Sequence, residues 1–188
     1  MPFYVHAEDR PGVGPRLLDL AEEHWSYMDE FDDRLVLRGP TLSADGEEHT
    51  GSVHVVDLDD RAAAERFAAE EPFWRAGLYG HLTTDRVVVL LDGRPGRGAY
   101  LSEGPYALVT GRWPVVRGEA GLPGGEPDGR LRFVAALVDD DRTGTTGIVA
   151  VAPGAPEAAR AVVQPVADLL AGAPVTLTAQ RWQRGGRS

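Results

Sequence analysis

The sequence predicts an α+β protein made of two ferredoxin-like halves (βαββαβ) that form an intramolecular pseudo-dimer of the dimeric α/β-barrel kind. Three observations predict this class. Strand-like and helix-like segments follow one another in the first half in the order β-α-β-β-α-β. A stretch rich in Gly and Pro then interrupts the pattern. Beyond it the same order of strands begins again, so the halves are read as an old duplication.

The first half, residues 1–92, contains four strand-like runs and two helix-like runs. The strands show alternating or continuous apolar residues, and the helices show apolar residues at three- and four-residue steps. A polar, turn-rich loop separates the second strand from the third. In chain order the expected elements are a strand at 3–7, a helix at 15–31, strands at 34–40 and 52–58, a helix at 59–71 and a strand at 85–91.

The second half, residues 106–188, repeats this order but lacks one element. Residues 93–105 have the composition of a linker. Strands are expected at 106–113, 131–138, 146–152 and 174–182, with a helix at 155–172. Where the first helix should recur, residues 114–129 hold too many glycines and prolines for a helix. We therefore expect a degenerate repeat that has lost its first helix, and one intact site in the first half.

The composition excludes several classes of function. A net charge of −10 disfavours binding to nucleic acid or to anionic membranes. The chain has no cysteine and no lysine, which excludes disulfides, thiolate chemistry and Schiff bases. No apolar run is long enough to span a bilayer, and the first residues do not resemble a signal peptide. These features fit a cytoplasmic protein, and the bias toward Arg, Ala, Gly and Pro is typical of a GC-rich bacterial genome.

Residues 3–91 resemble the YCII-related (YciI-like) family. Five separate motifs of that family occur here in order, while the second half keeps only the architecture. One departure is that a glutamate stands where the family usually has aspartate before the Pro-aromatic pair. The matching positions are His24, Gly39-Pro40, Gly51-Ser52, Glu71 with Pro72-Phe73, and Gly77-Leu78.

The resemblance implies a dimeric α/β-barrel fold and a pocket that contains a histidine and an acid. It defines the reaction poorly, because few members of the family have assigned activities. One assigned member is a dehydrochlorinase that acts on chlorinated hydroxyquinols. That activity suggests proton transfer on small aromatic or enolic substrates.

His24 is the leading candidate for a catalytic residue. It lies on the apolar stripe of the expected helix 15–31, where an imidazole needs a hydrogen-bonding environment. An imidazole is suited to proton transfer near neutral pH. Spacing alone favours a core histidine that is simply hydrogen-bonded, and only the family resemblance favours a functional role.

Glu71 is the candidate acidic partner of His24. It precedes Pro72, so we expect it at the C-terminal end of a helix, where the helix dipole should raise its pKa. A solvated glutamate next to Glu70 is the alternative. The aromatic residues Phe73, Trp74 and Tyr79 follow, and they either line a pocket for a flat substrate or belong to the ordinary core.

Other polar side chains are weaker candidates for the same site. Arg16 and Arg38 could bind an anionic substrate, or could instead pair with surface acids. Ser52 could donate a hydrogen bond to a substrate, but no motif of a serine hydrolase surrounds it. His6 and His54 could join His24 in a three-histidine metal site if all three share one face, which a one-residue change of register would prevent.

The sequence thus predicts a small cofactor-independent enzyme in which His24 and Glu71 transfer a proton on a small aromatic or polyketide-like metabolite. The reaction would be an elimination, an isomerisation or a cyclisation. The alternatives are a cofactor-free monooxygenase of the same architecture and a non-catalytic ligand-binding or accessory protein. We expect no metal and no nucleotide cofactor, because their motifs are absent. A homodimer of the two-repeat chain stays open.

Overall fold

The computed structural model describes residues 1–92, 105–122 and 130–186. They form two compact units, residues 1–85 together with the C-terminal residues from Arg184, and residues 86–183. The expected linker at 93–105 lies almost wholly outside the described residues, as do residues 123–129. None of the described helices is long and apolar enough to cross a membrane.

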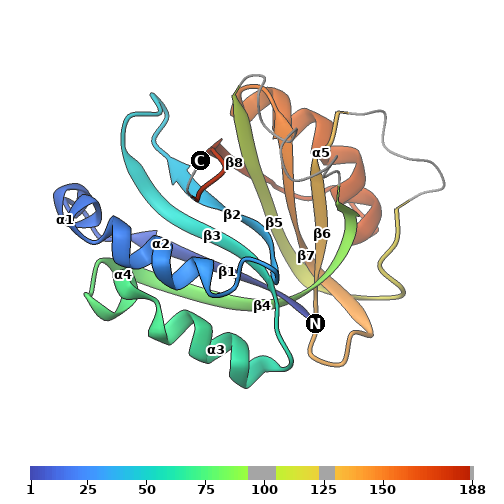
Figure 1. Cartoon of the computed structure of the whole chain (residues 1–188). Coiled ribbons are helices and arrows are strands. Elements are labelled where there is room, and N and C mark those ends of the chain that lie inside the picture. The colour runs from blue at the N-terminus through green and yellow to red at the C-terminus, as the bar shows by residue number, and fades with distance from the viewer. Residues whose placement is uncertain (93–104, 123–129, 187–188) are drawn as a thin grey trace. The chain divides into compact units, whose positions relative to one another are not determined.

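The N-terminal unit has the strand order β4-β1-β3-β2, and β1-β3 and β3-β2 are antiparallel pairs. Its helices lie against one face of this sheet (Figure 1). This is the order of a ferredoxin-like unit. In chain order the elements are β1 (Pro2–Asp9), α1 (Gly14–Asp19), α2 (Ala21–Asp29), β2 (Leu35–Leu42), β3 (His49–Asp57), α3 (Arg61–Glu70), α4 (Pro72–Arg75) and the beginning of β4 (Tyr79–Asp92).

The register of β1 and β3 determines which side chains face the helices. Phe3 is opposite Val56, and both belong to the buried cluster with α2 and α3. Two residues further along each strand, Val5 is opposite His54. Because side chains alternate between the faces of a strand, His54 faces the helices whereas His6 faces away from them. The structure therefore separates the two strand histidines that the three-histidine hypothesis required on one face.

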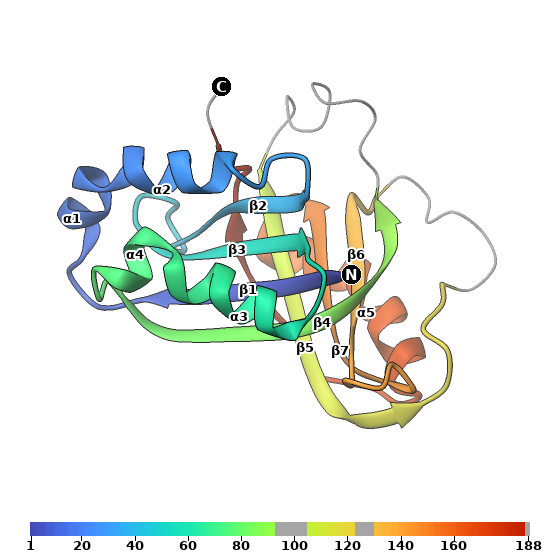
Figure 2. The ribbon, with the colours of Figure 1, turned by 60° about the horizontal axis from the view of Figure 1, so that its bottom comes forward.

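The helix expected at 15–31 is two helices, α1 and α2, with a break at Leu20. The helix expected at 59–71 is α3, and the Asp60 carboxylate accepts a hydrogen bond of 2.7 Å from the Ala63 N–H at its start. The short helix α4 was not expected. Pro72 occupies its first turn, where a missing N–H costs nothing. Figure 2 shows α3 and α4 in front of the sheet near β1, and α2 above β2 in that view.

A glycine ends α4. Gly77 adopts φ +69°, the left-handed conformation that ends many helices and that other residues rarely adopt. The Gly77 N–H donates to the Trp74 carbonyl and the Leu78 N–H donates to the Phe73 carbonyl. These two bonds turn the chain directly from α4 into β4. The Gly-Leu pair of the sequence thus places Phe73 and Tyr79 at opposite ends of one tight turn.

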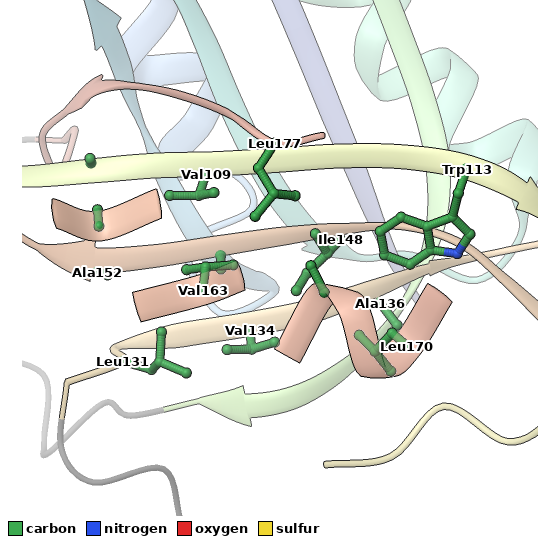
Figure 3. Packing of buried hydrophobic residues seen from close by; sticks show 14 of the residues in the cluster. Val109, Trp113, Leu131, Val134, Ala136, Ile148, Ala152, Val163, Leu170 and Leu177 are labelled. Carbon is green, nitrogen blue, oxygen red and sulfur yellow. The ribbon is translucent and has the colours of Figure 1, made fainter. Parts of the chain in front are cut away.

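The second unit repeats the ferredoxin-like strand order as β8-β5-β7-β6, with residues 86–92 of β4 next to β6. Its elements are β5 (Tyr106–Arg117), β6 (Phe133–Val138), β7 (Gly144–Pro153), α5 (Pro156–Ala171) and β8 (Thr178–Trp182). In Figure 3, Val163 and Leu170 of α5 pack with Val134 and Ile148 of the sheet. The described residues between β5 and β6 contain no helix, and residues 123–129 of the stretch expected to lack one lie outside the described residues.

Both units therefore belong to the α+β class that the sequence predicts, and each has the ferredoxin-like strand order. The unit boundary falls at residues 85 and 86, inside β4, whereas the sequence placed it at the linker that begins at residue 93. The C-terminal residues from Arg184 belong to the N-terminal unit, where the Gly185 N–H donates 3.0 Å to the Arg38 carbonyl. All the candidate site residues lie in the N-terminal unit.

Candidate functional site

His24 and Glu71 form a close pair on the helix side of the N-terminal sheet. The Nδ1 atom of His24, on α2, lies 2.6 Å from the Oε1 atom of Glu71. Both side chains are largely buried, with exposed fractions of 12% for His24 and 5% for Glu71. The two residues are 47 positions apart in sequence, and the packing of α2 against α4 brings them together. The pairing that the sequence proposed is therefore present in the fold.

Glu71 lies between two helices, α3 and α4. Glu71 follows the last residue of α3, as expected, but it is also the residue that caps the start of α4. Its Oε2 atom accepts a hydrogen bond of 2.8 Å from the Trp74 N–H. Glu71 therefore lies at the C-terminal end of α3, as expected, and also at the start of α4, where the helix dipole favours negative charge. The cap also leaves one carboxylate oxygen for His24 and fixes the direction in which it points.

The aromatic neighbours of His24 fix the plane of its ring. The Phe73 ring stacks on the imidazole with a centroid distance of 4.4 Å and an interplanar angle of 4°. Tyr79 contacts the same phenylalanine edge-to-face at 5.8 Å. Phe73 and Tyr79 are both buried, so they belong to the core and to the site at once. Trp74 is instead 37% exposed, and it bonds Glu71 through its backbone N–H.

Tautomer and geometry together define what His24 can do. With Nδ1–H donating to the carboxylate, Nε2 carries the lone pair and can accept a proton. Within the described parts of the chain, no protein atom bonds Nε2. A carboxylate that fixes the tautomer and stabilises the imidazolium is the arrangement that makes histidine a general base. The pair can therefore take up a proton at one defined atom.

His54 is a second imidazole beside the first. Its ring centroid lies 6.0 Å from that of His24 and 5.8 Å from that of Phe67. Burial lowers the pKa of His54 well below 6.5, and the positive charges of His24 and Arg38 lower it further. The structure therefore favours the neutral form of His54. A cluster of three metal-binding side chains is absent from the described residues, since His6 faces away.

Ser52 and Tyr79 form a separate contact on the same side of the sheet. The Tyr79 hydroxyl donates a buried hydrogen bond of 2.9 Å to Ser52 Oγ. Burial raises the pKa of Tyr79 well above 10.0, the charge of Glu71 raises it further, and the bond to Ser52 partly opposes both. The influence of Glu71 indicates that the phenol lies within electrostatic range of the His24–Glu71 pair.

The two arginines have different surroundings. Arg38 is opposite His54 in the β2-β3 register and pairs with Asp29 at 3.3 Å and Asp32 at 3.9 Å. Arg16 lies at the surface, where its guanidinium donates 3.2 Å to the Ala76 carbonyl at the end of α4. The structure thus brings Arg38 next to His54, whereas the contact of Arg16 stabilises the end of α4.

Two residues near Ser52 were missed by the sequence reasoning. Asp9, at the end of β1, and His49, at the start of β3, are paired with Nδ1 and Oδ2 2.7 Å apart. His49 Nε2 lies 3.4 Å from Ser52 Oγ. The sequence placed His49 in a loop, and its three-residue spacing from Ser52 was the only available signal.

Three comparisons with known proteins match about half of this chain or less. Residues 1–85 match the YCII-related domain. An uncharacterized protein from Haemophilus influenzae is 28% identical over an alignment of 86 residues, and the match covers 42% of this chain and 88% of that protein. The 5-chloro-2-hydroxyhydroquinone dehydrochlorinase from Burkholderia phenoliruptrix, solved with 2,5-dihydroxybenzoquinone, is 28% identical with a TM-score of 0.44, covering 46% of this chain and 92% of its own.

Two further structures are similar to almost the whole chain. Proposed monooxygenases from Lactobacillus acidophilus and Fusobacterium nucleatum each cover 97% of it, with TM-scores of 0.51 and 0.55. This chain in turn covers 93% and 91% of them, at identities of 10% and 9%. At such identities the likeness shows the fold alone, here for both units together. The candidate site lies in the first unit, whose residues 1–85 match the YCII-related domain.

Proposed function

We propose that the N-terminal unit is a proton-transfer enzyme in which His24 Nε2 is the general base and Glu71 orients it. The reaction class is an elimination, isomerisation or cyclisation of a small aromatic or polyketide-like metabolite. The observation that carries the proposal is the 2.6 Å contact between His24 Nδ1 and the capped, buried carboxylate of Glu71. A structural histidine needs a partner, but among the described residues none bonds the second nitrogen of His24, which leaves that nitrogen for a substrate.

The surroundings of the pair support a flat, partly polar substrate. Phe73 and Tyr79 provide aromatic surface, and Ser52 and the neutral His54 provide groups that can donate or accept a hydrogen bond. Arg38 would supply positive charge for a phenolate or enolate that forms when the proton leaves. Trp74 and Arg16, which are more exposed, would contact only a substrate that extends to the surface.

In the proposed step, a substrate C–H or O–H bond breaks and the proton passes to His24 Nε2. The electron pair stays on the substrate, where it forms an enolate or expels a leaving group. The resulting imidazolium is stabilised by Glu71, which keeps its negative charge. The same imidazolium can return the proton to another substrate atom, which completes an isomerisation, or lose it to solvent, which completes an elimination.

The test is turnover of 5-chloro-2-hydroxyhydroquinone, the compound named for the Burkholderia relative. Chloride release by the full chain is measured against the uncatalysed rate, and binding is measured in parallel by quenching of tryptophan fluorescence. The proposal expects chloride release that saturates with substrate. Binding that is tight but unaccompanied by release would favour the non-catalytic ligand-binding alternative.

A further inference from the structure

Asp9, His49, Ser52 and Tyr79 form a continuous hydrogen-bonded array in the N-terminal unit. The Tyr79 hydroxyl lies 2.9 Å from Ser52 Oγ, Ser52 Oγ lies 3.4 Å from His49 Nε2, and His49 Nδ1 lies 2.7 Å from Asp9 Oδ2. None of these contacts is explained by the pairing of His24 with Glu71. The array begins at a buried phenol and ends at a histidine whose side chain is 25% exposed.

The donors and acceptors of the array can be assigned one after another. Asp9 can only accept when ionised, so His49 Nδ1 donates to it and His49 Nε2 must be an acceptor. Ser52 has one hydroxyl proton, which it gives to Nε2, and its lone pairs accept from Tyr79. Every donor therefore points in the same direction, from the phenol outward to the exposed imidazole.

We propose that this array is a proton relay that connects the buried phenol of Tyr79 with solvent at His49, and makes Tyr79 a second proton-transferring group of the site. The proposal rests on the proposed function, because Tyr79 packs against Phe73, the residue stacked on His24. A relay gives the site two proton-handling groups, as an isomerisation or elimination needs when one proton is removed and another is delivered.

The relay moves one proton from the substrate to His49 in three transfers. A substrate proton forms a new O–H bond at Tyr79 while the old phenol proton passes to Ser52 Oγ, and the Ser52 hydroxyl proton passes to His49 Nε2. The substrate has then lost one proton and His49 has gained one, with its charge facing the Asp9 carboxylate. His49 releases that proton to water, and the reverse sequence delivers a proton to the substrate.

The geometry favours proton transfer over nucleophilic attack by Ser52. The serine is only 4% exposed and its oxygen already accepts the Tyr79 hydroxyl proton. A nucleophile needs that lone pair for the substrate. The contact from Ser52 to His49 is the longest of the three, so it is the weakest hydrogen bond of the relay.

The test measures exchange of the Tyr79 hydroxyl proton with solvent in the full chain, which needs no substrate. Protein labelled with ¹³C at the tyrosine Cζ is studied by NMR in an equal mixture of H₂O and D₂O. Slow exchange gives separate signals for the O–H and O–D forms, and fast exchange gives one. Tyr79→Phe assigns the signal. Tyr27, whose hydroxyl donates to the Phe67 carbonyl outside the array, is the internal control.

A relay predicts one averaged Tyr79 signal in the wild type. Exchange should slow by roughly tenfold or more in Ser52→Ala and in His49→Phe, because each removes a link in the path. Ser52→Thr keeps the hydroxyl and should keep fast exchange, and the Tyr27 signal should not change in any variant. If Ser52→Ala does not fold, the exchange rate of the Tyr79 proton in His49→Phe is compared with that in Ser52→Thr, and this comparison tests the relay.

Two results would overturn the relay and leave the array as a structural network. One is separate O–H and O–D signals for Tyr79 in the wild type. The other is an equal exchange rate in the wild type and in His49→Phe. Failure of the proposed function has a different signature. It would appear as absent turnover or as an active His24 variant, and neither affects the exchange rate of Tyr79.

Discussion

Replacing Glu71 by glutamine should separate the stability of the site from its activity. The carboxylate makes two bonds, one from the Trp74 N–H and one from His24 Nδ1. In Glu71→Gln the amide oxygen must face the Trp74 N–H, because the amide NH₂ would oppose that donor. The NH₂ group then faces His24 Nδ1, which becomes an acceptor, and the imidazole proton moves to Nε2.

The magnitudes follow from these bonds. Glu71→Gln keeps the cap and a hydrogen bond to His24, so it should cost only about 1 kcal/mol of unfolding free energy, the loss of charge assistance. Its rate should fall roughly 10⁴-fold, the size seen when the carboxylate of a catalytic triad becomes an amide. Glu71→Ala loses the cap, about 0.5–2 kcal/mol, and leaves the largely buried Nδ1–H of His24 without a partner, about 1–3 kcal/mol.

Urea unfolding and chloride release measured on the same preparations test this prediction. Glu70→Gln, a neighbouring exposed carboxylate, is the matched control and should change neither quantity. A folded Glu71→Gln protein with the wild-type rate would refute the reasoning, since His24 would then work in the wrong tautomer. A Glu70→Gln variant that loses as much activity would show that charge in general, and not the contact with His24, determines the rate.

Two further predictions concern the packing around the site. Burial lowers the pKa of His54 in the folded protein below its ordinary 6.5. As the pH falls, the unfolded chain therefore binds a proton at His54 before the folded protein does. Below pH 6.5 the free energy of unfolding should then decrease by about 1.4 kcal/mol per pH unit. Urea unfolding at several pH values should show this slope reduced in His54→Leu, and an identical slope in the variant would contradict the buried, neutral assignment. Gly51→Ala would place a Cβ 2.3 Å from the Ala7 carbonyl oxygen and should destabilise by about 1–3 kcal/mol. Gly80→Ala, whose Cβ would meet only the Arg10 side chain at 3.4 Å, should cost clearly less in the same assay, and equal losses would contradict the steric explanation.

The sequence predicted the order of elements well because each strand and helix has its own local pattern. It placed strands at positions that became β1, β2, β3, β5, β6 and β7, and helices that became α3 and α5. It missed the break at Leu20, where no glycine or proline marks the change from α1 to α2. Pro72, the first residue of α4, was read only as the end of the preceding helix.

The site was predictable only in part, for a physical reason. The family motif pointed to His24 and Glu71, and the fold brings them into contact across 47 residues of sequence. Distances of that kind depend on how helices pack, which no local pattern determines. The same limit hid the pairing of Asp9 with His49, which joins the end of one strand to the beginning of another. It also left open the face of His54, which the β1-β3 register decides.

The most direct test of the account is the rate of chloride release from 5-chloro-2-hydroxyhydroquinone by His24→Ala relative to the wild type, expressed per folded molecule. The account predicts a folded variant whose rate is lower by roughly 10²–10⁴-fold, the usual contribution of a general acid or base. His24→Gln should not restore the rate, because an amide cannot accept the proton. A wild type without turnover, or a His24→Ala variant that is less stable but equally active per folded molecule, would contradict the account and leave His24 a residue of the core.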